Sequence, residues 1–252
     1  MQRYFVQLSF KGSNYHGWQV QPNAITVQEI VEKAFSTVLR KKVVVTGAGR
    51  TDAGVHALFY ILHFDFPDYE IEIEKLVKRL NGFLPPDISL YKIWKVPADA
   101  HARFSALSRT YKYFIHSKKD PFKTEISYLF TGNLDIDKMN EGALIVKEYT
   151  DFTSFSRLHS DVKTNFCTVN FAHWEKRENS LIFTINADRF LRNMVRAITG
   201  TLIQLGRGKI SLEDLRKIID LKDRRAAGES VPAGGLFLTD IKYPENIMVC
   251  KG

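Results

Sequence analysis

Apolar residues in the N-terminal part of the chain follow two alternating periods, the two-residue period of strands and the three-to-four-residue period of helices. Strand-like segments rich in branched and aromatic residues lie at 4–10, 41–46, 57–66 and 88–96. Helical spacing fills 26–40 and 73–83, and the first of these opens on Thr26 and Glu29, the spacing of a capping box. The resulting order, β-α-β-β-α-β, predicts a split β-α-β, or ferredoxin-like, half.

The second half repeats this order less regularly. The expected elements are a strand at 108–117, a helix at 137–149, a hairpin with arms at 164–177 and 180–187 around Glu178-Asn179, helices at 189–206 and 211–220, and a strand at 235–243. We place the seam near Pro97 to Ser105 and expect an N-terminal half of residues 1–100 and a C-terminal half of residues 101–252. The predicted fold class is therefore α+β, with two ferredoxin-like halves whose antiparallel sheets flank a cleft.

The net charge of the chain indicates which class of partner the protein binds. Lys and Arg outnumber Asp and Glu by 36 to 28, and the net charge is +8. This balance favours a polyanionic partner such as nucleic acid, while a basic protein without such a partner stays an alternative. With 252 residues, of which 44% are hydrophobic, the chain can form one large or two smaller domains with real cores.

The cysteines and the apolar runs of the sequence argue against several classes of protein. Cys167 and Cys250 are far apart and no C-x-x-C pair exists, so neither a disulfide framework nor a cysteine-based zinc site is expected. The first residues lack the apolar region of a signal peptide, and no apolar run approaches the roughly 20 residues of a membrane span. We therefore expect a cytoplasmic protein with no membrane segment.

The stretch GAGRTDAGVHA, residues 47–57, is a glycine-rich turn after a predicted strand. Two phosphate-binding motifs fail in it. A dinucleotide fingerprint needs glycine where Asp52 stands, and a G-x-x-x-x-G-K-[ST] loop needs Lys and Ser or Thr where Val55 and His56 stand. Metal binding by Asp52 and His56 lacks a clear third ligand, so no metal is expected.

Asp52 has two further interpretations. An aspartate in a turn often caps a backbone amide. Arg50, however, lies two residues away, in a turn that Gly47, Gly49 and Gly54 allow the chain to make tightly. A carboxylate held near an arginine stays ionised and can act as a nucleophile or base.

This turn resembles the signature of the TruA family of tRNA pseudouridine synthases. Further blocks that resemble the family run along nearly the whole chain: GSNYHGWQVQPNAITVQE (12–29), AHARFSALSRTYKY (100–113), DFTSFS (151–156), FLRNMVRAITG (190–200) and PAGGLFL (232–238). Lys11 departs from the family, which usually has Asp before Gly12. The resemblance implies the pseudouridine synthase fold with a basic cleft, and an isomerase that converts uridine in tRNA to pseudouridine without metal or cofactor.

The resemblance also assigns roles to single residues. Asp52 would be the essential carboxylate, which attacks C1′ of the ribose, attacks C6 of the base, or drives elimination through a glycal. Arg50 would replace the flipped-out base or support Asp52. Tyr111 would stack on the target uracil and assist removal of the C5 proton, with Leu236 packing on the other face of the ring. As residues of predicted strands, Tyr111 and Leu236 also have a purely structural alternative.

Three arginines lie at i, i+3 and i+7 of the helix expected at 189–206, and they would share one face: Arg189, Arg192 and Arg196. They form either a solvated basic face or an RNA-binding one. The resemblance pairs one of them with the catalytic aspartate, and we expect this to be Arg196, with the other two binding RNA. His56 and Arg103, also in blocks of the family, are expected to contact RNA or to be structural.

The resemblance implies a substrate and an assembly as well. The family modifies uridines 38, 39 and 40 of the tRNA anticodon stem-loop and works as a homodimer, with one tRNA spanning both subunits. Two other classes of function stay open. A catalytically silent RNA-binding protein on the same scaffold is disfavoured by the intact Asp52, Arg50 and Tyr111. A metal-dependent hydrolase using Asp52 and His56 is disfavoured by the missing third ligand.

Overall fold

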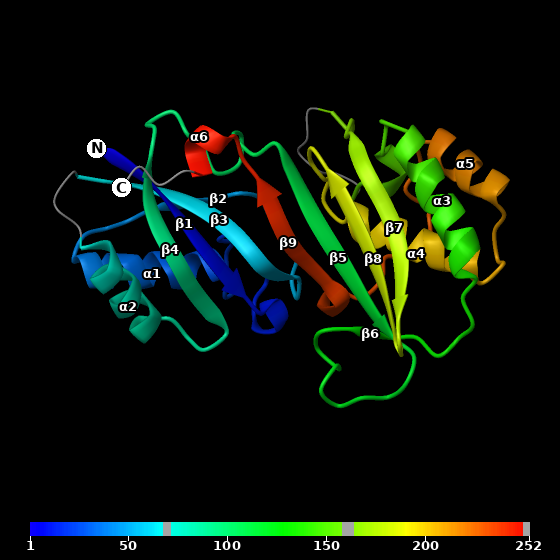
Figure 1. Ribbon diagram of the computed structural model, residues 1–252, viewed down its shortest axis with the longest axis horizontal. Helices are drawn as coiled ribbons and strands as arrows, with labels where there is room; N and C mark the ends of the chain where they lie inside the picture. Colours follow the sequence, from blue (N-terminus) through cyan, green and yellow to red (C-terminus); the bar gives the residue numbers. More distant parts are fainter. Residues whose placement is uncertain (68–71, 158–163, 249–252) are drawn as a thin grey trace. The chain divides into compact units, whose positions relative to one another are not determined.

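The computed structural model describes residues 1–67, 72–157 and 164–248 (Figure 1). The chain forms two compact units, one of residues 1–107 with the chain from Leu238 onward, and one of Ser108–Phe237. The last strand begins in the second unit and continues in the first. For this reason the units differ from the halves 1–100 and 101–252 drawn at the predicted seam. Cys250 lies outside the described residues.

The first unit has the split β-α-β order that the residue pattern predicts. Its elements are β1 (Gln2–Phe10), α1 (Val27–Leu39), β2 (Val45–Gly47), β3 (His56–Phe66), α2 (Ile73–Phe83), β4 (Ile88–Val96), the larger part of β9 (Leu236–Lys242) and α6 (Glu245–Met248). Strands β4, β1, β3 and β2 pair antiparallel in that order, which is the arrangement of the split motif. Helices α1 and α2 lie side by side against one face of this sheet (Figure 1).

Helix α1 forms because one of its faces is apolar and its start is capped. The N–H of Glu29 donates to Oγ1 of Thr26 at 3.4 Å, so Thr26 caps the helix as the sequence predicts. The buried residues of the helix are Val27, Val31, Ala34, Phe35 and Val38. The ring of Phe35 meets the ring of Phe64 in β3 edge-on, with 4.9 Å between centroids. This contact fixes α1 against the strand that follows the glycine-rich turn.

Strand β2 is shorter than the strand expected at 41–46 because the chain before it folds back onto α1. The N–H of Val43 donates to Oγ of Ser36 at 3.0 Å, and the Val43 side chain is buried. Only the next few residues remain to pair with β3, where Val45 lies opposite Phe64. Gly47 is therefore both the last residue of β2 and the first residue of the glycine-rich turn.

The second unit repeats the order of the first. Its elements are β5 (Ser108–His116), β6 (Tyr128–Leu129), α3 (Ile136–Glu148), β7 (Val169–Arg177), β8 (Ser180–Ala187), α4 (Met194–Gly206), α5 (Leu212–Asp220) and the start of β9. The strand order β9-β5-β8-β7 is again that of the split motif. The hairpin predicted around Glu178-Asn179 is confirmed, with Glu178 in the left-handed region at φ 50°. Strand β7 starts only at Val169, five residues later than predicted.

The long helix expected at 189–206 begins later, at Met194. Asn193 precedes it with φ 68°, a left-handed conformation that asparagine tolerates better than most residues. The Asn193 side chain donates from Nδ2 to Oγ of Ser230 at 2.6 Å, which stabilises this start. Arg189 and Arg192 therefore precede the helix, and the prediction that they share a helix face with Arg196 is wrong.

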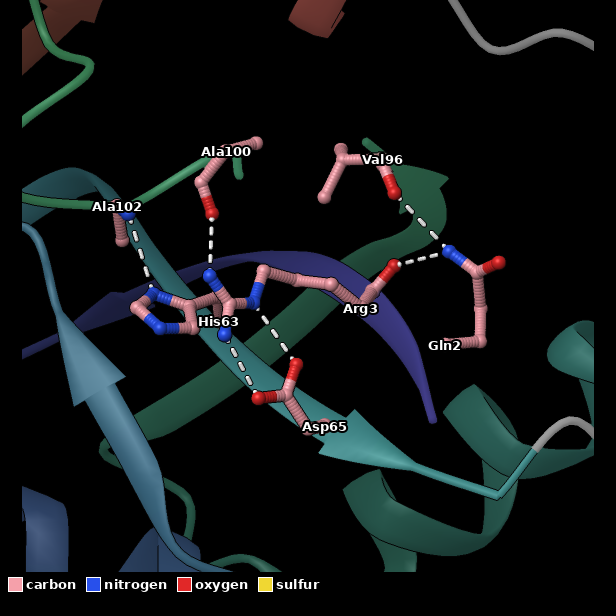
Figure 2. A network of polar contacts seen from close by, with 7 residues as sticks. All are labelled: Gln2, Arg3, His63, Asp65, Val96, Ala100 and Ala102. Atoms are coloured by element: carbon pink, nitrogen blue, oxygen red, sulfur yellow. Dashed lines mark hydrogen bonds and ion pairs between the residues drawn. The ribbon is translucent and has the colours of Figure 1, made fainter. Parts of the chain in front are cut away.

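A polar network fastens the segment after β4 to the sheet of the first unit (Figure 2). The Arg3 guanidinium binds Asp65 through two hydrogen bonds of 2.8 and 2.7 Å and donates a third to the Ala100 carbonyl at 3.0 Å. Nδ1 of His63 accepts the N–H of Ala102 at 3.1 Å. Side chains of β1 and β3, rather than sheet pairing, therefore hold this segment in place.

The free energy of unfolding should fall in mild acid because of His63. Burial of the ring, followed in importance by the charge of Arg3, lowers the pKa of His63 to about 4, whereas the unfolded chain has a pKa of about 6.5 at this residue. Between these values the unfolded state binds more protons. The free energy of unfolding should therefore drop by up to about 3 kcal/mol as the pH falls from about 6.5 to about 4. Urea denaturation across this range measures the effect.

His63→Asn is the matched control for this prediction. Its amide oxygen can accept the N–H of Ala102 in place of Nδ1, and it does not titrate. The variant should therefore lose less stability than the wild type over the same pH range. Equal losses in the two proteins would show that another group causes the acid sensitivity.

Candidate active site

The glycine-rich turn is anchored to strand β3 by a tyrosine that the sequence pattern did not single out. The hydroxyl of Tyr60 donates to the carbonyl of Gly49 and accepts the Gly49 N–H at 3.4 Å. The N–H of Ala48 donates to the Ile61 carbonyl at 2.8 Å. These three bonds lie just before Arg50 and Asp52, so β3 fixes the first part of the turn.

The segment after β1 supports the second part of the turn. The N–H of Gly54 donates to the Tyr15 carbonyl at 3.2 Å, and the N–H of Gly12 donates to Nδ1 of His56 at 2.9 Å. The Tyr15 hydroxyl in turn donates to Asp87 at 2.5 Å. Burial and this hydrogen bond raise the pKa of Tyr15, so its hydroxyl stays protonated and remains a donor. The turn is therefore clamped between two parts of the same unit.

Two glycines outside the turn allow the clamp to close. A Cβ on Gly12 would lie 2.0 Å from the carbonyl oxygen of Val55, and a Cβ on Gly17 would lie 2.2 Å from that of Thr51. Gly17 also has φ +87°, a conformation that side chains rarely adopt. Only glycine at these positions lets the backbone approach the residues on either side of Asp52.

The three glycines within the turn have different roles, which corrects the expectation that all three bend it. Gly54 has φ 79° and does serve the bend. A Cβ on Gly47 would lie 2.2 Å from the Tyr60 hydroxyl and 2.4 Å from Nε1 of Trp18, so Gly47 is needed for packing. Gly49 has neither a positive φ nor any atom within 4 Å of an added Cβ.

The side chains of the turn differ in exposure. Asp52 is half-buried and Arg50 is exposed. The Asp52 carbonyl accepts the N–H of Val55 at 3.2 Å, which closes a turn directly after the carboxylate. His56 is 1% exposed, and its Nδ1 is engaged by Gly12. His56 is therefore buried and supports the turn, which corresponds to a structural role and not to a contact with RNA.

Arg50 and Arg103 border one pocket of about 300 Å³ in the first unit. Both side chains are exposed, and the Arg103 guanidinium lies 5.4 Å from the centre of the Phe104 ring. The other residues that line the pocket are Trp18, Gln19, Gln28, Val44, Val45, Thr46, Gly47 and Gly49. Two arginines at one pocket suit the binding of an anionic group such as a phosphate.

In the second unit, Tyr111 and Tyr113 lie on strand β5 with opposite environments. Tyr111 is half-buried, and its ring meets Phe190 edge-on with 5.1 Å between centroids. Tyr113 is fully buried and donates from its hydroxyl to the Pro232 carbonyl at 2.8 Å. Burial raises the pKa of Tyr113, so this hydroxyl does not ionise. Tyr113 is therefore structural, and Tyr111 is the tyrosine of this strand with a partly accessible ring.

The start of β9 is held by α4 and β5. Nε of Arg196 donates to the Val231 carbonyl at 2.8 Å, and the N–H of Val231 donates back to the Arg196 carbonyl at 3.3 Å. A Cβ on Gly235 would lie 2.7 Å from the Tyr113 ring. Leu236 follows and is buried within this chain, at 5% exposure. Arg196, Tyr113 and Leu236 thus belong to one packed region of the second unit.

The other two arginines of the basic group lie in the chain before α4. Arg189 is half-buried and donates from Nη1 to Oγ1 of Thr164 at 3.3 Å. Arg192 is exposed, and its carbonyl accepts the N–H of Arg157 at 3.1 Å. Arg189 and Arg192 therefore differ in exposure and in the contacts that they make within the chain.

The described residues provide neither a reactive cysteine nor a cluster of metal ligands. Cys167 is buried, and this burial raises its pKa to about 12, so the thiolate needed for nucleophilic attack does not form at neutral pH. In residues 1–67, 72–157 and 164–248, no three His, Cys, Asp or Glu side chains lie close enough to hold a metal ion. No helix in these ranges is long and apolar enough to cross a membrane.

Comparison with known proteins decides the family. The sequence profile of a family described as "tRNA pseudouridine synthase" matches residues 8–105 and 149–244. The chain belongs to this family. The matched ranges contain the 47–57 turn, Arg196 and Leu236, whereas Tyr111 lies between them.

Relatives named "tRNA pseudouridine synthase A" match over nearly the full chain. The protein of Bacteroides thetaiotaomicron is 54% identical over 250 residues, which cover 98% of this chain and 93% of that protein. The protein of Bacteroides fragilis is 53% identical over 248 residues, 98% of each chain. The protein of Bacillus subtilis is 38% identical over 240 residues, 94% of this chain and 97% of that protein. The resemblance to TruA enzymes is confirmed, and with it the assignment to the isomerases that form pseudouridine.

The supports of the turn were missed by sequence reasoning from local patterns. In the sequence, Tyr60 is one of several apolar residues of a buried strand, and no nearby residue indicates its contact with Gly49. Gly12 and Gly17 do carry a signal, because they stand in a block that resembles the family. Their role follows only from the close approach to Val55 and Thr51.

Proposed function

We propose that this enzyme isomerises uridines 38, 39 and 40 of the tRNA anticodon stem-loop to pseudouridine. The observation that carries the proposal is an intact Asp52 on a clamped turn within the part of the chain that matches the family. We further propose that the enzyme acts in the cytoplasm as a homodimer with one tRNA spanning both subunits. The net charge of +8 supports binding of an extended polyanion.

The reaction requires two bonds to break and two to form. The N1–C1′ bond is cleaved, the uracil turns, and C5 bonds to C1′. The proton on C5 leaves to solvent or to a base, and N1 takes up a proton in its place. We assign Asp52 as the carboxylate that drives this reaction. It acts as a nucleophile that attacks C1′ or C6, or else it promotes elimination to a glycal intermediate. Its carboxylate needs no redox partner or metal for any of these steps.

The other residues are assigned to holding the uridine out of its stack. We propose that Arg50 occupies the space left by the flipped base and contacts phosphate, which its exposure permits. Tyr111 stacks on the uracil and assists loss of the C5 proton, and Leu236 covers the other face. Arg103, Arg189 and Arg192 bind the RNA backbone. The partly accessible Tyr111 ring supports this assignment over the buried Tyr113.

Arg196→Ala should impair catalysis more than RNA binding. We propose that Arg196 keeps the catalytic carboxylate charged and in place, so its loss should lower the turnover number by about 10²-fold while the Kd for tRNA changes little. Arg192→Ala removes the same side chain at an exposed position before the helix and should instead weaken binding. Single-turnover kinetics and filter binding separate the two effects. An unchanged turnover number in Arg196→Ala would refute the choice of this arginine.

The target positions are tested by mapping pseudouridine in RNA. Unmodified tRNA transcripts with uridine at 38, 39 or 40 are incubated with the purified enzyme, and the modified positions are read by chemical mapping. We expect pseudouridine at these three positions, and a stoichiometry of two subunits per particle by sedimentation. Modification only at other positions, or a monomer that is fully active, would refute the corresponding part of the proposal.

A further inference from the structure

The loop between β5 and β6 carries the most exposed large apolar side chain of the described residues. Phe122 is 90% exposed, more than the N-terminal Met1 at 85%. Figure 1 shows the loop, residues 117–127, extending away from the strands that it connects. An exposed phenylalanine forgoes the favourable free energy that burial of such a side chain contributes. An aromatic ring held in solvent in this way is accessible to a partner that binds from outside the chain.

Phe122 is presented by ordered turns. The carboxylate of Asp120 accepts the N–H of Phe122 at 3.0 Å, and the Asp120 carbonyl accepts the N–H of Lys123 at 3.1 Å. At the base of the loop, Nδ1 of His116 lies 2.9 Å from Oγ of Ser127. Pro121 restricts the backbone between the first of these turns and the ring. The loop conformation around Phe122 is therefore ordered before any partner binds.

The charges around Phe122 favour RNA as this partner. Lys118 and Lys119 are exposed just before the turn, while Lys123 lies 3.8 Å from Asp120 and is partly neutralised. Glu125, after the turn, is an exposed carboxylate, so the basic side of the loop is the side before Phe122. An aromatic ring beside lysines is the combination with which proteins bind unpaired nucleotides, since the ring stacks on a base and the lysines bind phosphate. At a contact between two copies of this loop, Lys118 and Lys119 of one copy would meet the same lysines of the other and repel them.

The loop also packs against the segment assigned to the uracil. A Cβ on Gly234 would lie 2.8 Å from the carbonyl oxygen of Glu125, so the loop backbone rests on the residues just before Leu236. This is the segment that Arg196 holds through Val231. An RNA whose target base reaches Leu236 therefore passes close to the loop.

We propose that the 117–127 loop is an RNA-binding site in which Phe122 stacks on an unpaired base of the tRNA and Lys118 and Lys119 bind the adjacent phosphates. The proposal rests on tRNA being the substrate. It adds a contact outside the reacting uridine, which would select RNAs that offer an unstacked base at a set distance from the target.

Three variants of Phe122 test the stacking contact by equilibrium binding to anticodon stem-loop RNA. Phe122→Ala should weaken binding about tenfold or more, and Phe122→Trp should retain it, because both Phe and Trp offer a flat ring. Phe122→Leu should bind as weakly as Phe122→Ala, since it is apolar without a stacking face. Phe83→Ala, which removes an exposed phenylalanine on α2, is the matched control and should bind like the wild type.

The lysines are tested through salt. Replacing both Lys118 and Lys119 by Ala should reduce the slope of log Kd against log salt concentration by about 1.4, the value for two lost contacts to single-stranded phosphate. Unchanged binding of Phe122→Ala, or full binding by Phe122→Leu, would overturn the stacking proposal. A lower sedimentation coefficient of Phe122→Ala would assign the loop to a subunit contact instead.

These measurements separate the loop from the proposed reaction. Binding is measured separately from conversion of the RNA. A wild-type enzyme that binds the stem-loop through Phe122 but forms no pseudouridine would contradict the proposed function and support the proposed RNA-binding role of the loop. A wild type that converts uridine while Phe122→Ala binds normally would contradict the loop alone.

Discussion

Asp52→Asn should abolish pseudouridine formation and leave the affinity for tRNA nearly unchanged. The amide has the size of the carboxylate but cannot act as the nucleophile, so we expect the turnover number to fall by roughly 10⁴-fold or more. The backbone of the turn should persist, because the bond from Val55 uses the carbonyl of residue 52 and not its side chain. Single-turnover conversion of tRNA and filter binding measure the two quantities.

Asp137→Asn is the control for this variant. Asp137 is exposed at the start of α3, and the substitution raises the net charge by the same amount. It should therefore show any effect of charge on tRNA affinity without touching the turn. Retained turnover in Asp52→Asn would remove Asp52 from the chemistry, and a large loss of binding would make it an RNA contact instead.

Gly17→Ala should damage both stability and activity, although residue 17 is not in the turn. The new Cβ would need φ +87° and would lie 2.2 Å from the Thr51 carbonyl oxygen, a backbone atom that cannot move without moving Asp52. We expect the free energy of unfolding to fall by roughly 2–4 kcal/mol. Turnover should fall about 10²-fold in the protein that remains folded, because a nucleophile misplaced by about 1 Å reacts poorly.

Gly49→Ala provides the matched comparison within the turn. An added Cβ at Gly49 meets nothing within 4 Å, and the residue has no positive φ. Its free energy of unfolding should change by less than about 0.5 kcal/mol. Urea denaturation of both variants tests this contrast. Equal stability of Gly17→Ala and Gly49→Ala would mean that the clamp on the turn does not exist in solution.

Local sequence patterns predicted most of the fold because its elements follow regular periods. Helix α1 could be located from the spacing of Val27 to Val38 and from the Thr26 cap, all of which act within one helix. Helix α4 could not be delimited in this way, because its start depends on Asn193 adopting a left-handed conformation against Ser230, far along the chain. Strand β2 is shorter than predicted because Oγ of Ser36, seven residues earlier, binds the N–H of Val43 and turns the chain back onto α1.

The candidate site was predictable only in part. The turn with Arg50 and Asp52 could be found because its residues are contiguous and resemble those of a known family. Its supports could not be found, because Tyr60 and Tyr15 reach it through isolated hydrogen bonds between separate parts of the chain, which leave no periodic pattern in the sequence. The role of Gly49 was misjudged, since a glycine in a turn need not be required by the backbone there.

Release of tritium from tRNA labelled at C5 of uridine tests the central claim most directly. Each conversion to pseudouridine replaces the bond between C5 and hydrogen by a bond to C1′, so released tritium counts turnovers. We predict release by the wild type, also in the presence of a metal chelator, and none above background by Asp52→Asn. Equal release by the two proteins, or no release by the wild type from any tRNA, would contradict the account.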